Sequence, residues 1–285
     1  RFLSALSGKN PKRFADGERR LGLAREITNS GNPLTRRVIV NWVWQHHFGR
    51  GLVRTPDDFG TRGNLPTHPK LLDFLAVTFL EDKWSLKKLH RRIMLTDVYK
   101  QGSLEKSSAR EMDPDNALLW RMPTRMLQME AMRDSMLAVS GELKRTGGGR
   151  PFEEKADRAI PRRTVYAFLN RDVISKLSST FNGADPAACT VKRPETMVPQ
   201  QTLFALNSNF IQDRATALLK LPNIRQAESE EDRVRVIYRR IYSREPDAGE
   251  VKEALAFLTP GKEPEEGRRQ FVHALLASNE FHFVD

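Results

Sequence analysis

Three histidines and two aspartates in the first third of the chain have the types needed to bind a metal ion: His46, His47, Asp57, Asp58 and His68. Imidazole and carboxylate ligands hold catalytic zinc, which turns a bound water into a nucleophile for hydrolysis. Adjacent His46 and His47 project about 100° apart on a helix. A site therefore needs one of them beside His68 and one aspartate, brought close when the chain folds back. The alternative is a histidine that complements a helix C-terminus and binds the following backbone.

Arginines alternate with these carboxylates, and two interpretations of them stay open. Arg50, Arg54 and Arg62 either pair with the aspartates and brace an irregular segment, or form a cluster that binds phosphate, sulfate or carboxylate. Arg162 and Arg163 are further anion-binding candidates, with ordinary solvation as the alternative. The glycines around the first cluster lack the spacing of a nucleotide-binding loop.

Signatures of other reaction classes are absent from the sequence. The single cysteine, Cys189, excludes internal disulfides, paired-cysteine zinc sites and covalent haem attachment, so we expect no cofactor in this chain. There is no GxSxG or HExxH motif, and no carboxylate pair is marked for glycoside hydrolysis. The sequence does not decide whether the protein is an enzyme, and it favours a protein without catalytic activity.

Positive charge is concentrated at the start of the chain. The net charge is +11, and residues 1–100 hold 19 Lys and Arg against 9 Asp and Glu, whereas residues 201–285 hold 12 against 14. This asymmetry favours an anionic partner, although a solvated face or one covered by another domain is the alternative. No stretch approaches the roughly 20 apolar residues of a membrane helix, so we predict no membrane span.

Helical periodicity dominates and predicts a mainly α-helical, multi-helix fold. Asn32 and Pro33 have the types that begin a helix, which we expect to end at Gly49. The long loop from there to Pro69 is expected to be ordered, because it carries apolar anchors: Leu52, Val53, Phe59 and Leu65. This loop must position the histidines, aspartates and arginines described above.

A helical hairpin is expected next, over Leu71–Lys100, with a break at Trp84 and Ser85. Its second helix, predicted from Leu86 to Lys100, has apolar residues on one side and a basic outer face made by Lys87, Lys88, Arg91 and Arg92.

The second half of the chain also reads as helices with one irregular region. A long helix is predicted from Arg125 to about Leu143, and helices resume at Pro199. Glycines at Thr146–Gly149 predict a boundary between an N-terminal helical subdomain, residues 1–146, and a C-terminal one, residues 147–285; one continuous domain is the alternative. Alternation over Thr164–Phe168 predicts a short strand, the most β-structure we expect.

Several segments together resemble a known bacterial family. They are NWVWQHHFGRGLVRTPDDFG at residues 41–60, GNLPTHP at 63–69, WSLKKLHRRIMLTDVYKQ at 84–101, the run at 113–143, VPQQTLFALNSNFI at 198–211 and ALLASNEFHFVD at 274–285. The chain resembles family 1553 of the domains of unknown function, the C-terminal domain of large planctomycete proteins that often carry a cytochrome-c-like module. The family often has an acidic residue where this chain has Asn182.

The resemblance implies an exported protein, at the periplasm or cell surface, whose partners include other domains of a longer chain and a neighbouring sulfatase-related protein. It implies no catalytic residues. Combined with the charge asymmetry, it leads us to expect a non-catalytic interaction module that binds an anionic partner or glycan. Two alternatives stay open: a metal-assisted hydrolase of anionic polysaccharide that uses the histidines and aspartates, and a nucleic-acid-binding domain, which the sequence favours least.

Overall fold

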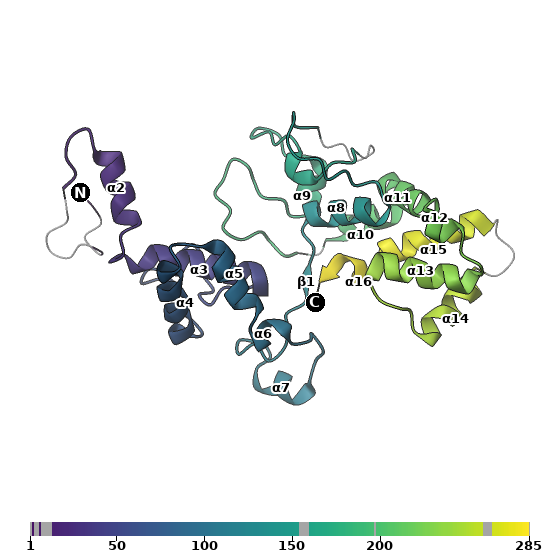
Figure 1. Cartoon of the computed structure of the whole chain (residues 1–285), viewed down its shortest axis with the longest axis horizontal. Coiled ribbons are helices and arrows are strands. Elements are labelled where there is room, and N and C mark those ends of the chain that lie inside the picture. Colours follow the sequence, from purple (N-terminus) through teal and green to yellow (C-terminus); the bar gives the residue numbers. More distant parts are fainter. Residues whose placement is uncertain are drawn as a thin grey trace. The chain divides into compact units, whose positions relative to one another are not determined.

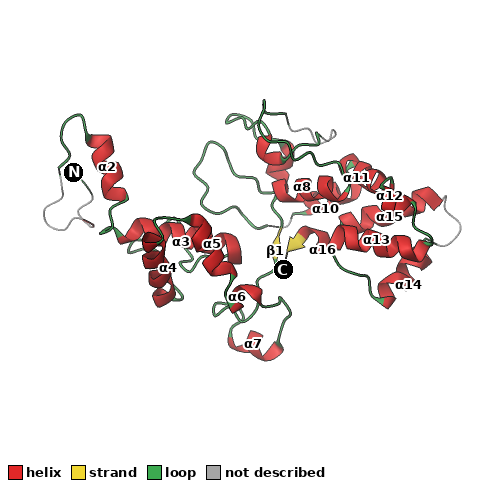
Figure 2. Ribbon diagram, in the orientation of Figure 1, coloured by secondary structure: helices red, strands yellow, loops and turns green. Residues whose placement is uncertain are grey.

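The described residues fold mainly into helices, which long irregular segments connect. The computed structural model describes residues 2, 6, 13–153, 160–196, 198–258 and 264–284. Those residues form fifteen α-helices, one 3₁₀ helix and one two-stranded antiparallel sheet (Figures 1 and 2), so the predicted mainly α-helical class is confirmed. The chain divides into two compact units, an N-terminal unit that runs to Thr124 and a C-terminal unit, Arg125–Val284.

The N-terminal unit is built on three helices that pack on one another, α3, α4 and α5. Its described helices are α2 (Arg19–Ile27), α3 (Pro33–Phe48), α4 (Pro69–Glu81), α5 (Leu86–Met94), α6 (Asp97–Lys100) and α7 (Ser107–Met112). Trp44 and Phe48 stack with ring centroids 4.3 Å apart, and both are buried with Phe79 and Ile93. Burial of these aromatic and aliphatic side chains holds the three helices together.

Local signals place the ends of these helices correctly. The Asn32 side chain accepts a hydrogen bond from the Leu34 amide, and Pro33 fills the first helical position, where its missing N–H costs nothing. Gly49 ends α3 in the left-handed region, with φ of 75°. Ser85, at the predicted break, caps α5 by accepting a hydrogen bond from the Lys88 amide.

The helix predicted from Leu86 to Lys100 is interrupted. Thr96 donates a hydrogen bond from its hydroxyl to the Ile93 carbonyl and accepts one from the Tyr99 amide. A threonine that binds nearby backbone in this way ends one helix and caps the next, which separates α5 from α6.

The C-terminal unit contains most of the described helices. Its described elements are β1 (Arg125–Met126), α8 (Met129–Val139), the 3₁₀ helix η1 (Thr164–Tyr166), α9 (Lys176–Thr180), α10 (Pro199–Asn207), α11 (Asn209–Leu219), α12 (Pro222–Arg225), α13 (Glu230–Tyr242), α14 (Ala248–Phe257), α15 (Pro264–Leu276), α16 (Asn279–His282) and β2 (Phe283–Val284). In Figure 1, α11 and α15 lie along each other, and each also packs on neighbouring helices.

Helix α8 belongs to the core of this unit. Met132, Met136 and Leu137 are buried with Ile211 and Val272 in one apolar cluster. The segment from Arg125 to Thr146, which the sequence analysis assigned to the N-terminal subdomain, is therefore part of the C-terminal unit, and the division falls between Thr124 and Arg125. The glycines of Thr146–Gly149 lie inside the C-terminal unit.

One helix prediction and one strand prediction are wrong. Residues 125 and 126, expected to begin a long helix, instead form β1, which pairs with β2 at the C-terminal end of the unit. The stretch Thr164–Phe168, expected as a strand, forms η1 and then a single bridge between Phe152 and Ala167. The first difference comes from pairing between residues far apart in the chain. In the second, Thr164 bonds to Arg133 and Asp134 of α8, and local alternation specifies neither contact.

A buried histidine, His282, ends α16. Its Nε2 lies 3.1 Å from the Leu276 carbonyl oxygen, which fits a neutral ring that donates its N–H. Burial lowers the pKa of His282 below its ordinary value of about 6.5, although the bond to Leu276 opposes that change. The folded C-terminal unit therefore prefers the neutral imidazole.

We predict that the C-terminal unit loses stability as the pH falls below about 6.5. Below that pH His282 binds a proton in the unfolded chain but resists it in the folded chain. The contribution of His282 to the free energy of unfolding therefore declines by up to about 1.4 kcal/mol per pH unit, until the folded group also titrates. Hydrogen exchange of α13 and α15 at pH 5 and 7.5 measures this. His282→Gln, which keeps a donor but does not titrate, should reduce the pH dependence; an unchanged dependence contradicts the role of His282.

Candidate functional site

The loop between α3 and α4 is ordered, and a buried asparagine fixes it. Asn41 is fully buried; its Nδ2 donates to the Val53 carbonyl at 3.0 Å and its Oδ1 accepts from the Val53 amide at 2.8 Å. The Thr67 amide donates to the Leu52 carbonyl at 2.9 Å. Leu52 and Val53 are buried anchors as predicted, whereas Leu65 is 88% exposed and anchors nothing.

The middle of the loop is braced by hydroxyl and backbone groups. The Thr55 hydroxyl donates to the Asp58 carbonyl and accepts from the Asn64 amide, each at 2.9 Å. The turn also requires glycine, because a Cβ on Gly63 would lie 2.0 Å from the Asp58 carbonyl oxygen. This loop is a packed platform that backbone contacts hold in shape.

The predicted metal ligands are not brought together. His46 and Asp57 are exposed, and the Asp58 carboxylate accepts a hydrogen bond from the Gly60 amide. His68 Nδ1 lies 3.0 Å from the Thr67 hydroxyl, at the start of α4. Across the residues that the structure describes, no group of three or more His, Cys, Asp and Glu side chains could hold a metal ion.

His47 instead pairs with a histidine from α5. Its Nε2 lies 2.8 Å from Nδ1 of His90, and its ring also meets the Tyr99 ring edge-on, with centroids 5.3 Å apart. The pair joins the C-terminal end of α3 to α5. Folding therefore brings His47 beside a histidine 43 residues further along the chain.

Two arginines of the loop contact Asp115, which the sequence did not suggest as a partner. Arg50 donates to the Asp115 carbonyl at 3.3 Å, and Arg54 lies 3.5 Å from the Asp115 carboxylate. Arg62 is exposed. Arg50 and Arg54 thus link the loop to the segment after α7, and among the described residues neither forms an ion pair with Asp57 or Asp58.

The outer face of α5 is basic, as its periodicity predicted. Lys88 and Arg92 both bind the Asp82 carboxylate, each at 2.9 Å, and these bonds hold the pKa of Asp82 below its usual value. Lys87 and Arg91, one turn apart and both exposed, form no ion pair with any described residue. Two cations of this face are therefore neutralised in part, and two are not.

In the C-terminal unit, a buried guanidinium organises the segment that contains Arg162 and Arg163. Arg133 of α8 is only 4% exposed, and it donates to the carbonyls of Ile160 at 2.7 Å and Arg162 at 3.0 Å and to the Thr164 hydroxyl at 3.1 Å. Sequence analysis missed this residue. The signal in the sequence that could have identified it is its position, because Arg133 is a single arginine among the methionines of a predicted helix.

The two predicted anion-binding arginines of this segment have different environments. Arg162 donates to the Arg150 carbonyl and stacks on Tyr166, with its guanidinium carbon 5.1 Å from the ring centroid. Arg163 is 57% exposed and lies 3.9 Å from the Asp134 carboxylate. The structure places Arg162 in a bracing role and leaves Arg163 at a surface.

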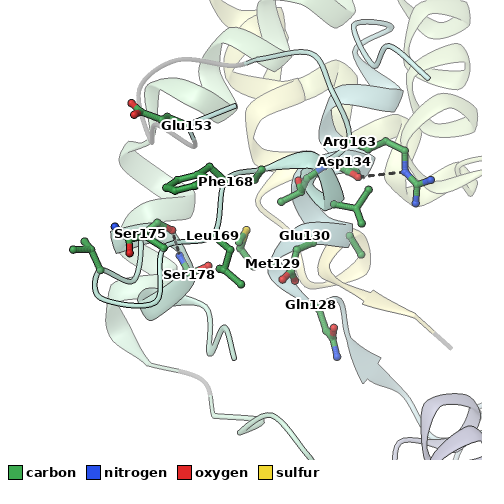
Figure 3. A pocket seen from close by; sticks show the side chains of 16 residues that line it. Gln128, Met129, Glu130, Asp134, Glu153, Arg163, Phe168, Leu169, Ser175 and Ser178 are labelled. Atoms are coloured by element: carbon green, nitrogen blue, oxygen red, sulfur yellow. Dashed lines mark hydrogen bonds and ion pairs between the residues drawn. The ribbon is translucent and has the colours of Figure 1, made fainter. Parts of the chain in front are cut away.

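That surface is the wall of a groove, which we call the α8 groove. Its volume is about 790 Å³, and it lies between the start of α8, η1 and the start of α9 (Figure 3). Apolar side chains make up much of it, with carboxylates at the edge; the lining includes Met129, Glu130, Asp134, Glu153, Val165, Phe168, Leu169 and Val173. The sequence signal for it was a set of apolar residues in an otherwise polar, non-helical region.

Replacing the buried guanidinium is expected to loosen this wall. Arg133→Met leaves the Ile160 and Arg162 carbonyls without their donor, so we predict a loss of roughly 2–4 kcal/mol from the C-terminal unit's free energy of unfolding. Arg133→Lys should not restore it, because one ammonium cannot reproduce the planar fork. Urea unfolding followed by circular dichroism measures the loss.

The control is Arg171→Met, at an exposed arginine beyond the same wall. It should change stability by less than about 0.5 kcal/mol. If Arg133→Met costs no more than this control, the guanidinium does not hold the segment.

Comparison with known proteins adds the family and nothing about chemistry. The model of a family described as a protein of unknown function, DUF1553, matches residues 19–258. No curated protein and no solved structure matches the chain significantly. None of the described helices is long and apolar enough to cross a membrane. The family match spans most of both units, from α2 to the end of α14, and the chain therefore belongs to the DUF1553 family.

Proposed function

We propose that this chain is a non-catalytic interaction module whose N-terminal unit binds an anionic glycan through the outer face of α5. The observation that supports this most is the arrangement of that face. Lys87 and Arg91 are exposed and lack an ion pair among the described residues, and Lys88 and Arg92 stand beside them. Unpaired cations grouped on one rigid helix attract a polyanion with little ordering cost.

The neighbourhood of α5 supports a binding surface on the same side. Arg92 lies over the ring of Phe74, 5.9 Å from its centroid, and Phe74 is 52% exposed. Leu95, at the end of α5, is 58% exposed. The face therefore combines charge with apolar area, and a ligand that offers only charge would leave part of it unused.

A glycan is proposed over a nucleic acid for two reasons. Asp82 lies within the basic face and shares its charge with Lys88 and Arg92, which reduces the attraction to closely spaced phosphates. Export, which the family resemblance implies, is part of the same proposal, because it would put this face among extracellular polysaccharides. The arginines of the loop, Arg50 and Arg54, are less suited to the task because both contact Asp115.

We predict that Lys87→Glu with Arg91→Glu weakens binding to a fluorescein-labelled heparin oligosaccharide about tenfold or more, since each reversed charge costs roughly 1 kcal/mol or more. Binding by the unaltered chain should also weaken as NaCl rises from 50 to 300 mM, because salt screens exposed charges. Fluorescence anisotropy measures both effects.

The matched control is Lys220→Glu with Lys252→Glu, which makes the same change in net charge at exposed lysines of the C-terminal unit. It should weaken heparin binding far less than the α5 variant. An equal loss in the two variants contradicts a specific face. Tighter binding of duplex DNA than of heparin at the same salt concentration contradicts the glycan assignment.

A further inference from the structure

We propose that the α8 groove of the C-terminal unit is a docking site for a peptide segment of another protein, one that carries an apolar anchor side chain next to Lys or Arg. This goes beyond glycan binding, because it concerns a different unit, a different surface and the opposite ligand charge. The proposal rests on the groove's shape, its exposed apolar lining and its charge.

The groove is hollow enough to take side chains of a partner. Its volume of about 790 Å³ lies in the range of sites that enclose small ligands or several peptide side chains. Figure 3 shows Met129 and Glu130 of α8 on one side and Phe168 and Leu169 on the segment opposite. The two sides come from parts of the chain about forty residues apart, so folding creates the site.

Several apolar side chains that line the groove are largely exposed to solvent. Four of them are more than half exposed: Val165 at 67%, Phe168 at 56%, Leu169 at 66% and Val173 at 66%. Exposed apolar residues are common singly, but a group lining one concave surface marks a contact site. Burial against a partner would release water from all four.

Carboxylates exceed cations in the lining. Three carboxylates line the groove, those of Glu130, Asp134 and Glu153. Among the described lining residues, Arg163 is the one cation. Burial alone would raise the pKa of Glu130, but two bonds from Arg193, at 2.7 and 2.9 Å, outweigh it and hold that pKa below its usual value. Glu130 is therefore ionised, and Arg193 offsets its charge. Glu153 is exposed and forms no ion pair with any described residue, so this carboxylate on the rim favours a cationic ligand.

The walls are preorganised. Asp134 accepts hydrogen bonds from the Thr164 amide at 2.8 Å and from its hydroxyl at 2.7 Å, while Arg133 holds the Ile160 and Arg162 carbonyls. These contacts tie η1, which precedes Phe168, to α8. A partner that enters the groove does not have to order this wall, so more of its contact energy appears as affinity.

The test uses the full chain and two fluorescent seven-residue peptides, one that alternates Leu with Lys and one with Glu in place of every Lys. The chain carries a net charge of +11, so non-specific attraction favours the Glu peptide. The proposal predicts the reverse, with the Lys peptide binding at least tenfold more tightly in anisotropy titrations. Equal affinity, tighter binding of the Glu peptide, or no binding of either peptide overturns it.

Variants then locate the site. Phe168→Ser with Leu169→Ser should weaken the Lys peptide tenfold or more, and Glu153→Lys should weaken it about threefold. The control is Leu203→Ser with Leu206→Ser, which removes two leucines of α10 that are each 57% exposed and do not line the groove. Circular dichroism checks that each variant stays folded. If the α10 variant loses as much affinity as the Phe168 and Leu169 variant, the peptide binds elsewhere and the proposal fails.

Discussion

Buried backbone N–H and C=O groups must find hydrogen-bond partners, and this constraint explains how the long non-helical segments of both units keep their shape. Helices satisfy their own backbone, but irregular segments packed against a core do not. In the N-terminal unit the side-chain amide of Asn41 pairs with the backbone N–H and C=O of Val53. In the C-terminal unit the Arg133 guanidinium pairs with the carbonyls of Ile160 and Arg162.

Both side chains come from a helix and reach a segment that has no regular structure of its own. Asn41 lies on α3 and Arg133 on α8, and each is at least nine-tenths buried. In each unit the held segment precedes, or forms part of, the structure that carries the surface proposed for binding. The loop after α3 leads into the α4 and α5 hairpin with its basic face, and the segment held by Arg133 forms a wall of the α8 groove. Rigid segments can present such surfaces without a large entropic cost on binding.

Features of the fold that depend on neighbouring residues were predictable from the sequence. Asn32 with Pro33 and Ser85 place helix starts because capping involves only the next few residues. The basic face of α5 follows from helical spacing alone. The family was also recognisable, because whole segments of residues resemble it and the resemblance is confirmed by the family match.

What the sequence did not predict depends on pairing over long distances. Residues 125 and 126 favour a helix locally but pair with residues 283 and 284. Arg50 and Arg54 have Asp57 and Asp58 close by in sequence, yet they contact Asp115. The candidate ligands His46, His68 and Asp57 are near in sequence, yet the described residues hold no group of three or more such side chains that could bind a metal ion. The α8 groove was not predicted, because its two walls meet only after folding.

The most direct test of this account is native-state hydrogen exchange at the Val53 amide, which donates to buried Asn41. In the unaltered chain we predict protection comparable to that of core amides in α3, although Val53 lies in a loop. In Asn41→Leu we predict that amides of the loop exchange at least tenfold faster while those of α4 keep most of their protection. A Val53 amide that exchanges as fast as an exposed one, or that does not respond to Asn41→Leu, contradicts the claim that buried side chains hold these segments in place.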